Sequence, residues 1–242
     1  PHPPHPSRPP RLKRAVRAGA VRGLVPPWLW TRLQPTGVWE LHTCDGTPFR
    51  YAAAEDDEHS RSFVWTDLRH WEEATCPVFC ALARRSRGFL GVSAGTGTCA
   101  GLYTLLACTA NPALRAVTVE PHPAAAGRLR HNLAVNGLEQ RVSVVERAPT
   151  DRAVGPLPVD LVKIDGAGPA ADVLRGMPRT LARHRPIVIA GCPDRDALDR
   201  LRAEGAAHGY ETVLHLGTAG PRRAPEGFTP PARHRNFLLT AG

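Results

Sequence analysis

Residues 88–97 read GFLGVSAGTG, a short apolar run that ends in closely spaced glycines. An apolar run of this length, bounded by turn residues, is typical of a buried strand. Glycines after a first strand let the backbone approach a ligand at the carboxyl edge of a doubly wound sheet. Gly95, Gly97 and Gly101 miss the dinucleotide spacing G-x-G-x-x-G by one residue. We therefore predict a ligand-binding turn here, and the spacing counts against NAD.

From residue 86 onward, strand-like runs alternate with helical patterns, which indicates a parallel, doubly wound sheet. Helices are predicted over 101–109, 123–135, 170–184 and 195–208. Residues 217–235 contain four prolines and form too long a link for an ordinary connection, so we predict a lid or a mobile segment there. The fold class is therefore α/β, with the main domain over 86–242. Its seven predicted strands are Gly88–Val92, Arg115–Glu120, Val142–Glu146, Asp160–Asp165, Pro186–Ala190, Glu211–Leu216 and Asn236–Thr240.

Residues 25–85 have a different composition, since all five tryptophans of the chain lie before residue 72. Two strands are expected at Val38–His42 and Pro48–Ala53. A helix is predicted from about Asp67 to Arg85, with a kink at Pro77. We interpret 25–85 as an N-terminal cap packed on the main domain, with its aromatic residues in the core.

The net charge of +9 is concentrated at the N-terminus. Seven basic and no acidic residues precede Glu40, whereas the remainder has 24 basic against 22 acidic residues. We predict that 1–24 is a disordered basic tail and that the folded body need not bind phosphate. The spacing of Leu12, Val16 and Val21 indicates a short helix, for which a solvated, frayed state is favoured over contact with an acidic surface or a membrane.

The composition otherwise indicates an ordinary cytoplasmic protein. No apolar run approaches the roughly 20 residues of a membrane span, and no signal peptide is recognisable. The six cysteines have neither disulfide-framework nor zinc-site spacing, so we predict buried, reduced thiols and no metal.

Three polar residues lie at or near the carboxyl ends of predicted strands, at the same edge of the sheet. Glu120 ends the second strand, where a carboxylate can accept hydrogen bonds from the two ribose hydroxyls of an adenosine. Asp165 ends the fourth strand, and alternation places Lys163 on the same side of the sheet. Lys163 and Asp165 are candidate catalytic residues, with a structural ion pair as the alternative.

Two segments resemble the FkbM family of methyltransferases. The first runs from Glu120-Pro121-His122-Pro123 through Leu129–Leu138, and the second combines Leu161–Asp165 with Val173–Gly176 and Thr180–Pro186. The resemblance covers about residues 88–192. It implies a seven-stranded class I methyltransferase fold, S-adenosylmethionine as cofactor, and methyl transfer to a hydroxyl group, often of a natural product or sugar.

The resemblance also implies the cofactor-binding residues. They are Gly91, Ser93, Ala94, Gly95, Thr96, Gly97, Glu120, Pro121, His122, Ala148 and Asp165. This chain departs from the family at several of these positions and their neighbours. The family usually has Asp at position 91 and Gly at 93, residues 98–101 resemble an insertion, and the two glutamates that usually follow Asp165 are missing. An acid often found after the fifth strand is replaced by Gly191.

Three hypotheses follow. The first is a methyltransferase that acts on a small-molecule hydroxyl, with Asp165 as general base and Lys163 orienting it; His70 or His122 are alternative bases. The second is a catalytically impaired protein that retains a cofactor or partner site, because several carboxylates are missing from one crevice. The third is a nucleic-acid methyltransferase that uses the basic tail.

Overall fold

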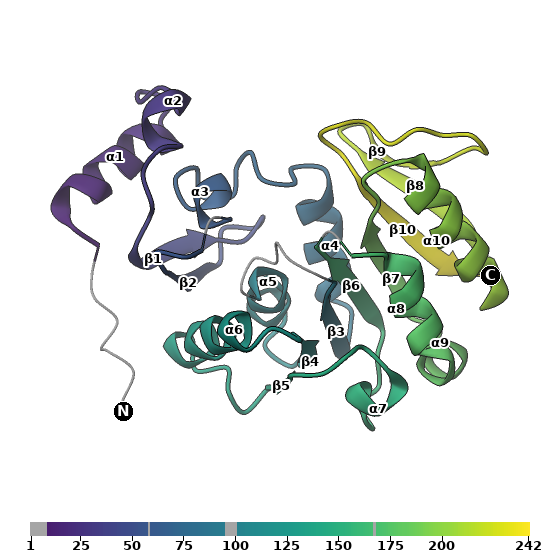
Figure 1. Cartoon of the computed structure of the whole chain (residues 1–242). Helices are drawn as coiled ribbons and strands as arrows, with labels where there is room; N and C mark the ends of the chain where they lie inside the picture. Colours follow the sequence, from purple (N-terminus) through teal and green to yellow (C-terminus); the bar gives the residue numbers. More distant parts are fainter. Residues whose placement is uncertain (1–8, 58, 95–100, 167) are drawn as a thin grey trace.

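The computed structural model describes residues 9–57, 59–94, 101–166 and 168–242. Its main feature is an eight-stranded sheet with the order β5-β4-β3-β6-β7-β10-β8-β9 (Figure 1). The strands of this sheet are β3 (Gly88–Ser93), β4 (Arg115–Val119), β5 (Val142–Val145), β6 (Leu161–Asp165), β7 (Ile187–Gly191), β8 (Tyr210–Gly217), β9 (Gly220–Arg223) and β10 (Asn236–Ala241).

The strands β3 to β7 are parallel, and the chain order reverses on either side of β3, which lies between β4 and β6. Strand β10 runs antiparallel to both β7 and β8. All seven predicted strands are therefore confirmed. The eighth, β9, pairs with β8 inside the segment for which a lid or a mobile link was predicted, so this prediction is wrong for Gly220–Arg223.

Helices cover both faces of the sheet (Figure 1). The sheet separates two hydrophobic cores, one on each face. On one face, α5 (Leu102–Ala110) and α6 (Pro123–Val135) pack with the N-terminal region. The opposite face is covered by α7 (Asp151–Val154), α8 (Ala170–Gly176), α9 (Pro178–His184) and α10 (Arg195–Ala207). One helix was predicted where α8 and α9 lie. Two form, because Pro178 cannot continue a helix through its own position but fits a first turn.

The N-terminal region contains α1 (Arg11–Val21), α2 (Pro27–Trp30), the antiparallel hairpin β1 (Gly37–His42) and β2 (Pro48–Ala53), α3 (Ser60–Phe63) and α4 (Thr75–Ala83). The hairpin packs against α6, where Asn132 Oδ1 accepts the Ala52 N–H at 2.7 Å. Of the tryptophans, Trp39, Trp65 and Trp71 are buried in the core that the cap shares with α5 and α6. The domain boundaries themselves stay a prediction.

The helix predicted over 67–85 is wrong in its first half. Helix α4 begins only at Thr75, and Asp67, Leu68 and Glu72 have positive φ angles of 54°, 63° and 43°. A left-handed backbone conformation cannot continue a right-handed helix. Pro77 causes no kink because it lies in the first turn of α4, where its missing N–H has no helical partner to lose.

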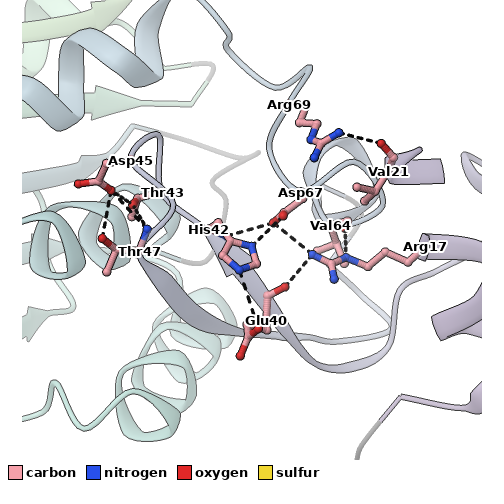
Figure 2. Close-up of polar contacts among 10 residues, drawn as sticks. All are labelled: Arg17, Val21, Glu40, His42, Thr43, Asp45, Thr47, Val64, Asp67 and Arg69. Carbon is pink, nitrogen blue, oxygen red and sulfur yellow. Dashed lines mark hydrogen bonds and ion pairs between the residues drawn. The ribbon is translucent and has the colours of Figure 1, made fainter. Parts of the chain in front are cut away.

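Residues 11–21 are helical and are held to the cap, so the predicted solvated tail is wrong for this segment. Figure 2 shows Arg17 of α1 between Val64, Glu40 and Asp67. Its Nε donates to the Val64 carbonyl at 2.8 Å and its Nη2 to the Glu40 carbonyl at 2.7 Å, with Asp67 Oδ1 at 3.1 Å. Asp67 also accepts the His42 N–H at 3.0 Å. Residues 1–8 lie outside the described residues.

No helix in the part of the chain that the structure describes combines the length and the hydropathy needed to cross a membrane.

Candidate functional site

The carboxyl ends of β3 and β6 are joined by close backbone contacts. The Ala94 N–H donates to the Asp165 carbonyl at 2.7 Å, and the Gly168 N–H donates to the Ala94 carbonyl at 2.5 Å. A Cβ atom at Gly166 or Gly168 would lie 2.7 or 2.6 Å from the Ala94 oxygen. Glycine is thus required for the two turns to approach this closely. The predicted cofactor residues Gly95, Thr96 and Gly97 lie outside the described residues.

Glu120 directly follows β4, on the side of β3 opposite to Asp165. It is 2% exposed, and its Oε1 accepts the His122 N–H at 3.1 Å, which fixes the carboxylate at the edge of the sheet. His122 is exposed at the start of α6, and Pro121 is half-buried. The contact of Glu120 with the ribose of a cofactor stays a prediction.

Lys163 is a buried cation at the centre of the site. The residue is 1% exposed, and its Nζ donates to Asp165 Oδ1 at 3.3 Å and to Asn236 Oδ1 at 3.2 Å. The same nitrogen lies 4.5 Å from the centroid of the Tyr103 ring, which adds a cation–π contact. The side chain of Asp165 is 24% exposed, so this carboxylate connects the buried ammonium group to the surface of the site.

Glu72 brings a second carboxylate into this cluster from the cap. The Tyr103 hydroxyl donates a hydrogen bond to Glu72 Oε2, and the Asn236 side chain hydrogen-bonds to the same carboxylate. Burial raises the pKa of Glu72, Lys163 lowers it, and Asp165 raises it further. Burial likewise raises the pKa of Tyr103. The cluster therefore places the carboxyl groups of Glu72 and Asp165 and the hydroxyl of Tyr103 near the ammonium group of Lys163.

Sequence reasoning assigned no site role to Glu72, Tyr103 or Asn236. Glu72 was placed inside a helix, where nothing distinguishes it from the neighbouring Glu73. Its left-handed backbone conformation is the feature that turns it toward the sheet, and such conformations in non-glycine residues concentrate at functional sites. The role of Glu72 could have been predicted only from a sequence pattern that showed the segment before α4 to be non-helical.

A small cavity of about 120 Å³ adjoins the cluster. It is lined by His70, Glu72, Glu73, Arg233 and His234. The first three come from the cap, and the last two come from the segment that precedes β10. Glu72 therefore belongs both to the buried cluster and to the wall of a space that a small ligand group can enter.

The structure shows the surroundings of two departures from the FkbM pattern. Gly91 is buried in β3, and a Cβ atom there would lie 3.2 Å from the Thr104 hydroxyl oxygen, so an aspartate would require neighbours to move. Gly191 ends β7, and a Cβ atom there would lie 3.8 Å from Asn236 Oδ1. Asn236 pairs with Gly191 in the sheet and bonds Lys163 across it. The chain thus lacks the family's acidic residues at positions 91 and 191, and the cap supplies the carboxyl group of Glu72 to the same region.

The remaining predicted cofactor residues lie apart from the cluster or at its edge. Ser93 is buried at the end of β3 and pairs with Asp165. Ala148 is exposed in the segment between β5 and α7. Their predicted contacts with a cofactor stay predictions. The structure does bring Lys163 and Asp165 together, as the alternation of side chains along β6 indicated.

No protein-family model and no curated protein sequence matches the chain. Among solved structures, it is similar to the precorrin-6y C5,15-methyltransferase of Geobacter metallireducens GS-15 (TM-score 0.49, 17% identity, 78% of this chain and 92% of that one). It is also similar to an S-adenosylmethionine-dependent O-methyltransferase of Thermotoga maritima (TM-score 0.49, 12% identity, 71% and 66%). A third similar structure is the C-terminal domain of the precorrin-6Y C5,15-methyltransferase of Rhodobacter capsulatus (TM-score 0.46, 26% identity, 69% and 86%).

Because each of these TM-scores lies below 0.5, the fold assignment rests on the strand order and pairing of the chain itself. The parallel strands β3 to β7, the antiparallel β10 inserted beside β7, and the helices on both faces confirm the predicted fold class. This is the Rossmann-like, doubly wound α/β fold of class I methyltransferases. Membership of the FkbM family is not confirmed and stays a prediction.

Proposed function

We propose that this protein is an S-adenosylmethionine-dependent methyltransferase that acts on a hydroxyl group of a small molecule, as the resemblance to the FkbM family suggests. The observation that supports it most is the cluster at the carboxyl edge of the sheet, where Asp165, Lys163 and Glu72 meet beside a cavity. Ligands of doubly wound sheets bind at this edge, near the strand where the order reverses.

The cofactor side of the site lies toward β4. Glu120 would hold the ribose hydroxyls, and the turn after β3 would carry the methionine part. When bound, S-adenosylmethionine supplies an electrophilic methyl group on a positively charged sulfur. The carboxylates of the site favour that positive charge by simple electrostatics.

The acceptor side lies in the cavity lined by Glu72. An acceptor bound there would lie beside Glu72, and its positioning would supply much of the acceleration. Bound S-adenosylmethionine would supply the methyl group, and Asp165 would take the proton of the acceptor hydroxyl, which would contribute roughly 10²- to 10⁴-fold. Lys163 holds Asp165 in place through its hydrogen bond. Glu72 would bind the acceptor or receive the proton from Asp165.

Isothermal titration calorimetry with S-adenosylmethionine, followed by detection of S-adenosylhomocysteine with a panel of hydroxylated compounds, tests this proposal. We expect micromolar binding for the unmodified chain and weaker binding for Glu120→Gln. Asp165→Asn should retain binding but lose at least roughly 100-fold in turnover.

Asp172→Asn is the matched control, because it makes the same chemical change on the exposed surface of α8. Undiminished turnover in Asp165→Asn would remove this residue from the mechanism. Absence of S-adenosylmethionine binding by the unmodified chain would exclude the enzyme and favour the alternative, a methyltransferase-fold protein without catalysis. That alternative is motivated by Gly91 and by the missing carboxylates after Asp165.

A further inference from the structure

The exposed apolar side chains of this protein are concentrated at its N-terminal end. Among the described residues, the large hydrophobic side chains with high exposure are Leu12 (76%), Leu24 (76%), Trp28 (63%) and Leu29 (38%). They all belong to α1, α2 and the short link between them. Exposed leucine and tryptophan side chains are unfavourable in water unless another apolar surface covers them, so their clustering marks an interaction surface.

Helix α1 presents this surface in a fixed orientation. Arg17 and Ala20 face the cap, where Arg17 is held by the Val64 and Glu40 carbonyls and by Asp67 (Figure 2). Lys13 adds a bond to Thr36 Oγ1 at 2.6 Å, and Arg69 donates to the Val21 carbonyl at 2.9 Å. The outward side of the helix is therefore defined, and its exposed residues are Arg11, Leu12, Ala15, Ala18 and Arg22.

The link between α1 and α2, and α2 itself, also expose apolar side chains next to arginine. Leu24, Trp28 and Leu29 are exposed beside Pro26 and Pro27, and Arg32 follows. No acidic residue precedes Glu40, so cations flank these apolar side chains without compensating anions in the same segment. We define the N-terminal face as the exposed side chains Arg11, Leu12, Ala15, Ala18, Arg22, Leu24, Trp28, Leu29 and Arg32.

We propose that the N-terminal face binds the surface of an anionic lipid bilayer, with α1 and α2 lying in the plane of the headgroups. Arginine at the rim would contact lipid phosphates, while the leucines and Trp28 enter the boundary between headgroups and acyl chains. Tryptophan favours this boundary because its ring is apolar and its N–H is polar. Nucleic acid would engage the arginines but would leave most of the exposed leucine surface in water.

The arrangement of the molecule is compatible with this binding mode. In Figure 1, α1 and α2 lie at one end, and the strands β8 to β10 with the C-terminus lie at the other. The cluster around Lys163 belongs to the sheet between them. Docking through the N-terminal face would therefore leave the carboxyl edge of the sheet accessible, and the proposal does not depend on the proposed enzymatic function.

Sedimentation of the 242-residue chain with vesicles tests the proposal. Vesicles of phosphatidylcholine mixed with phosphatidylglycerol are compared with vesicles of phosphatidylcholine alone, at low and at high salt. We expect binding to the anionic vesicles, much weaker binding to the neutral ones, and weakening by salt. Emission from Trp28 should shift to shorter wavelength on binding, and Trp28→Ala should remove that shift.

Two variants separate the apolar from the charged contribution. Leu24→Ala with Trp28→Ala should abolish binding at physiological salt. Arg11→Gln with Arg22→Gln should weaken it by roughly fivefold per arginine. Arg147→Gln with Arg200→Gln, at exposed arginines elsewhere on the surface, should leave it unchanged.

Circular dichroism should show the same fold for each variant. The proposal is overturned if the chain does not bind anionic vesicles. It is also overturned if Arg147→Gln with Arg200→Gln weakens binding as much as Arg11→Gln with Arg22→Gln does. Retardation of an RNA oligonucleotide without vesicle binding would instead assign the N-terminal face to nucleic acid.

Discussion

Two cationic side chains in very different surroundings hold parts of the N-terminal region in place. Arg17 lies at the edge of the cap, with its side chain 18% exposed, and its guanidinium donates to two backbone carbonyls and meets Asp67. Lys163 lies in the sheet, 1% exposed, among Asp165, Asn236, the Tyr103 ring and the field of Glu72. The first network joins α1 to the cap, and the second joins the cap to the sheet.

The difference lies in how the charge is balanced. Around Arg17, most partners are neutral carbonyl oxygens with fixed positions, and one carboxylate completes the set. Around Lys163, the carboxyl groups of Asp165 and Glu72 lie near one ammonium group; burial raises the pKa of Glu72, and Lys163 lowers it. The comparison indicates a structural role for Arg17, whereas a catalytic role for Lys163 and Asp165 stays a prediction.

The largest effect on stability is expected for Lys163→Met. This change leaves the carboxylates of Asp165 and Glu72 without their buried cation, and breaking a buried ion pair on one side costs about 3–5 kcal/mol. Urea denaturation monitored by tryptophan fluorescence measures the loss. A loss smaller than that of Arg17→Met would contradict the contrast between the two networks.

A smaller loss is expected for Arg17→Met. The substitution removes hydrogen bonds from a charged donor, each with a net value of about 1.5–3 kcal/mol, but solvent can reach part of the site and rehydrate the exposed acceptors. The expected loss is therefore about 2 kcal/mol. Protease sensitivity of residues 11–24 should rise at the same time, and an unchanged digestion pattern would show that α1 is held in another way.

Arg17→Lys should cost less, about 1 kcal/mol, because a lysine keeps the charge but cannot reach three acceptors with one planar group. The measurement is again denaturation in urea. If Lys at position 17 were as destabilising as Met, the charge would contribute nothing, and the geometry of the guanidinium alone would explain the network.

The mildest effect is expected on the pH dependence of stability. The pKa of Glu72 is raised in the folded state, so its contribution is fully present below the pKa of the unfolded chain and is lost as pH rises through the folded pKa. Glu72→Gln should remove this loss and make the folded state relatively more stable toward neutral pH. Thermal denaturation between pH 4 and pH 8 measures it, with Glu73→Gln, at the exposed neighbouring position, as control. If the stability of Glu72→Gln and Glu73→Gln depended on pH in the same way, the raised pKa of Glu72 would be contradicted.

The alternation of strands and helices from residue 88 onward was predictable because each element follows a local period. Apolar runs such as 88–92 and 161–164 need burial on both faces, and helices such as α6 and α10 have recognisable beginnings and ends. The failures lie where local propensity was overridden. The segment before α4 reads as helical, but Asp67 accepts hydrogen bonds from His42 and ion-pairs with Arg17, and these contacts hold the backbone in a left-handed conformation.

By itself, the sequence determined the doubly wound sheet, the places of Glu120 and Asp165 at its carboxyl edge, and the location of Lys163 on the same side as Asp165. Each of these depends on spacing within one strand or on the order of neighbouring elements. Only the tertiary structure decided that Glu72 joins Tyr103 and Asn236, that Arg17 clamps α1 to the cap, and that α1 and α2 expose leucine and tryptophan. These contacts join residues far apart in the chain, and their energies come from burial and charge in a shared environment, which no local pattern encodes.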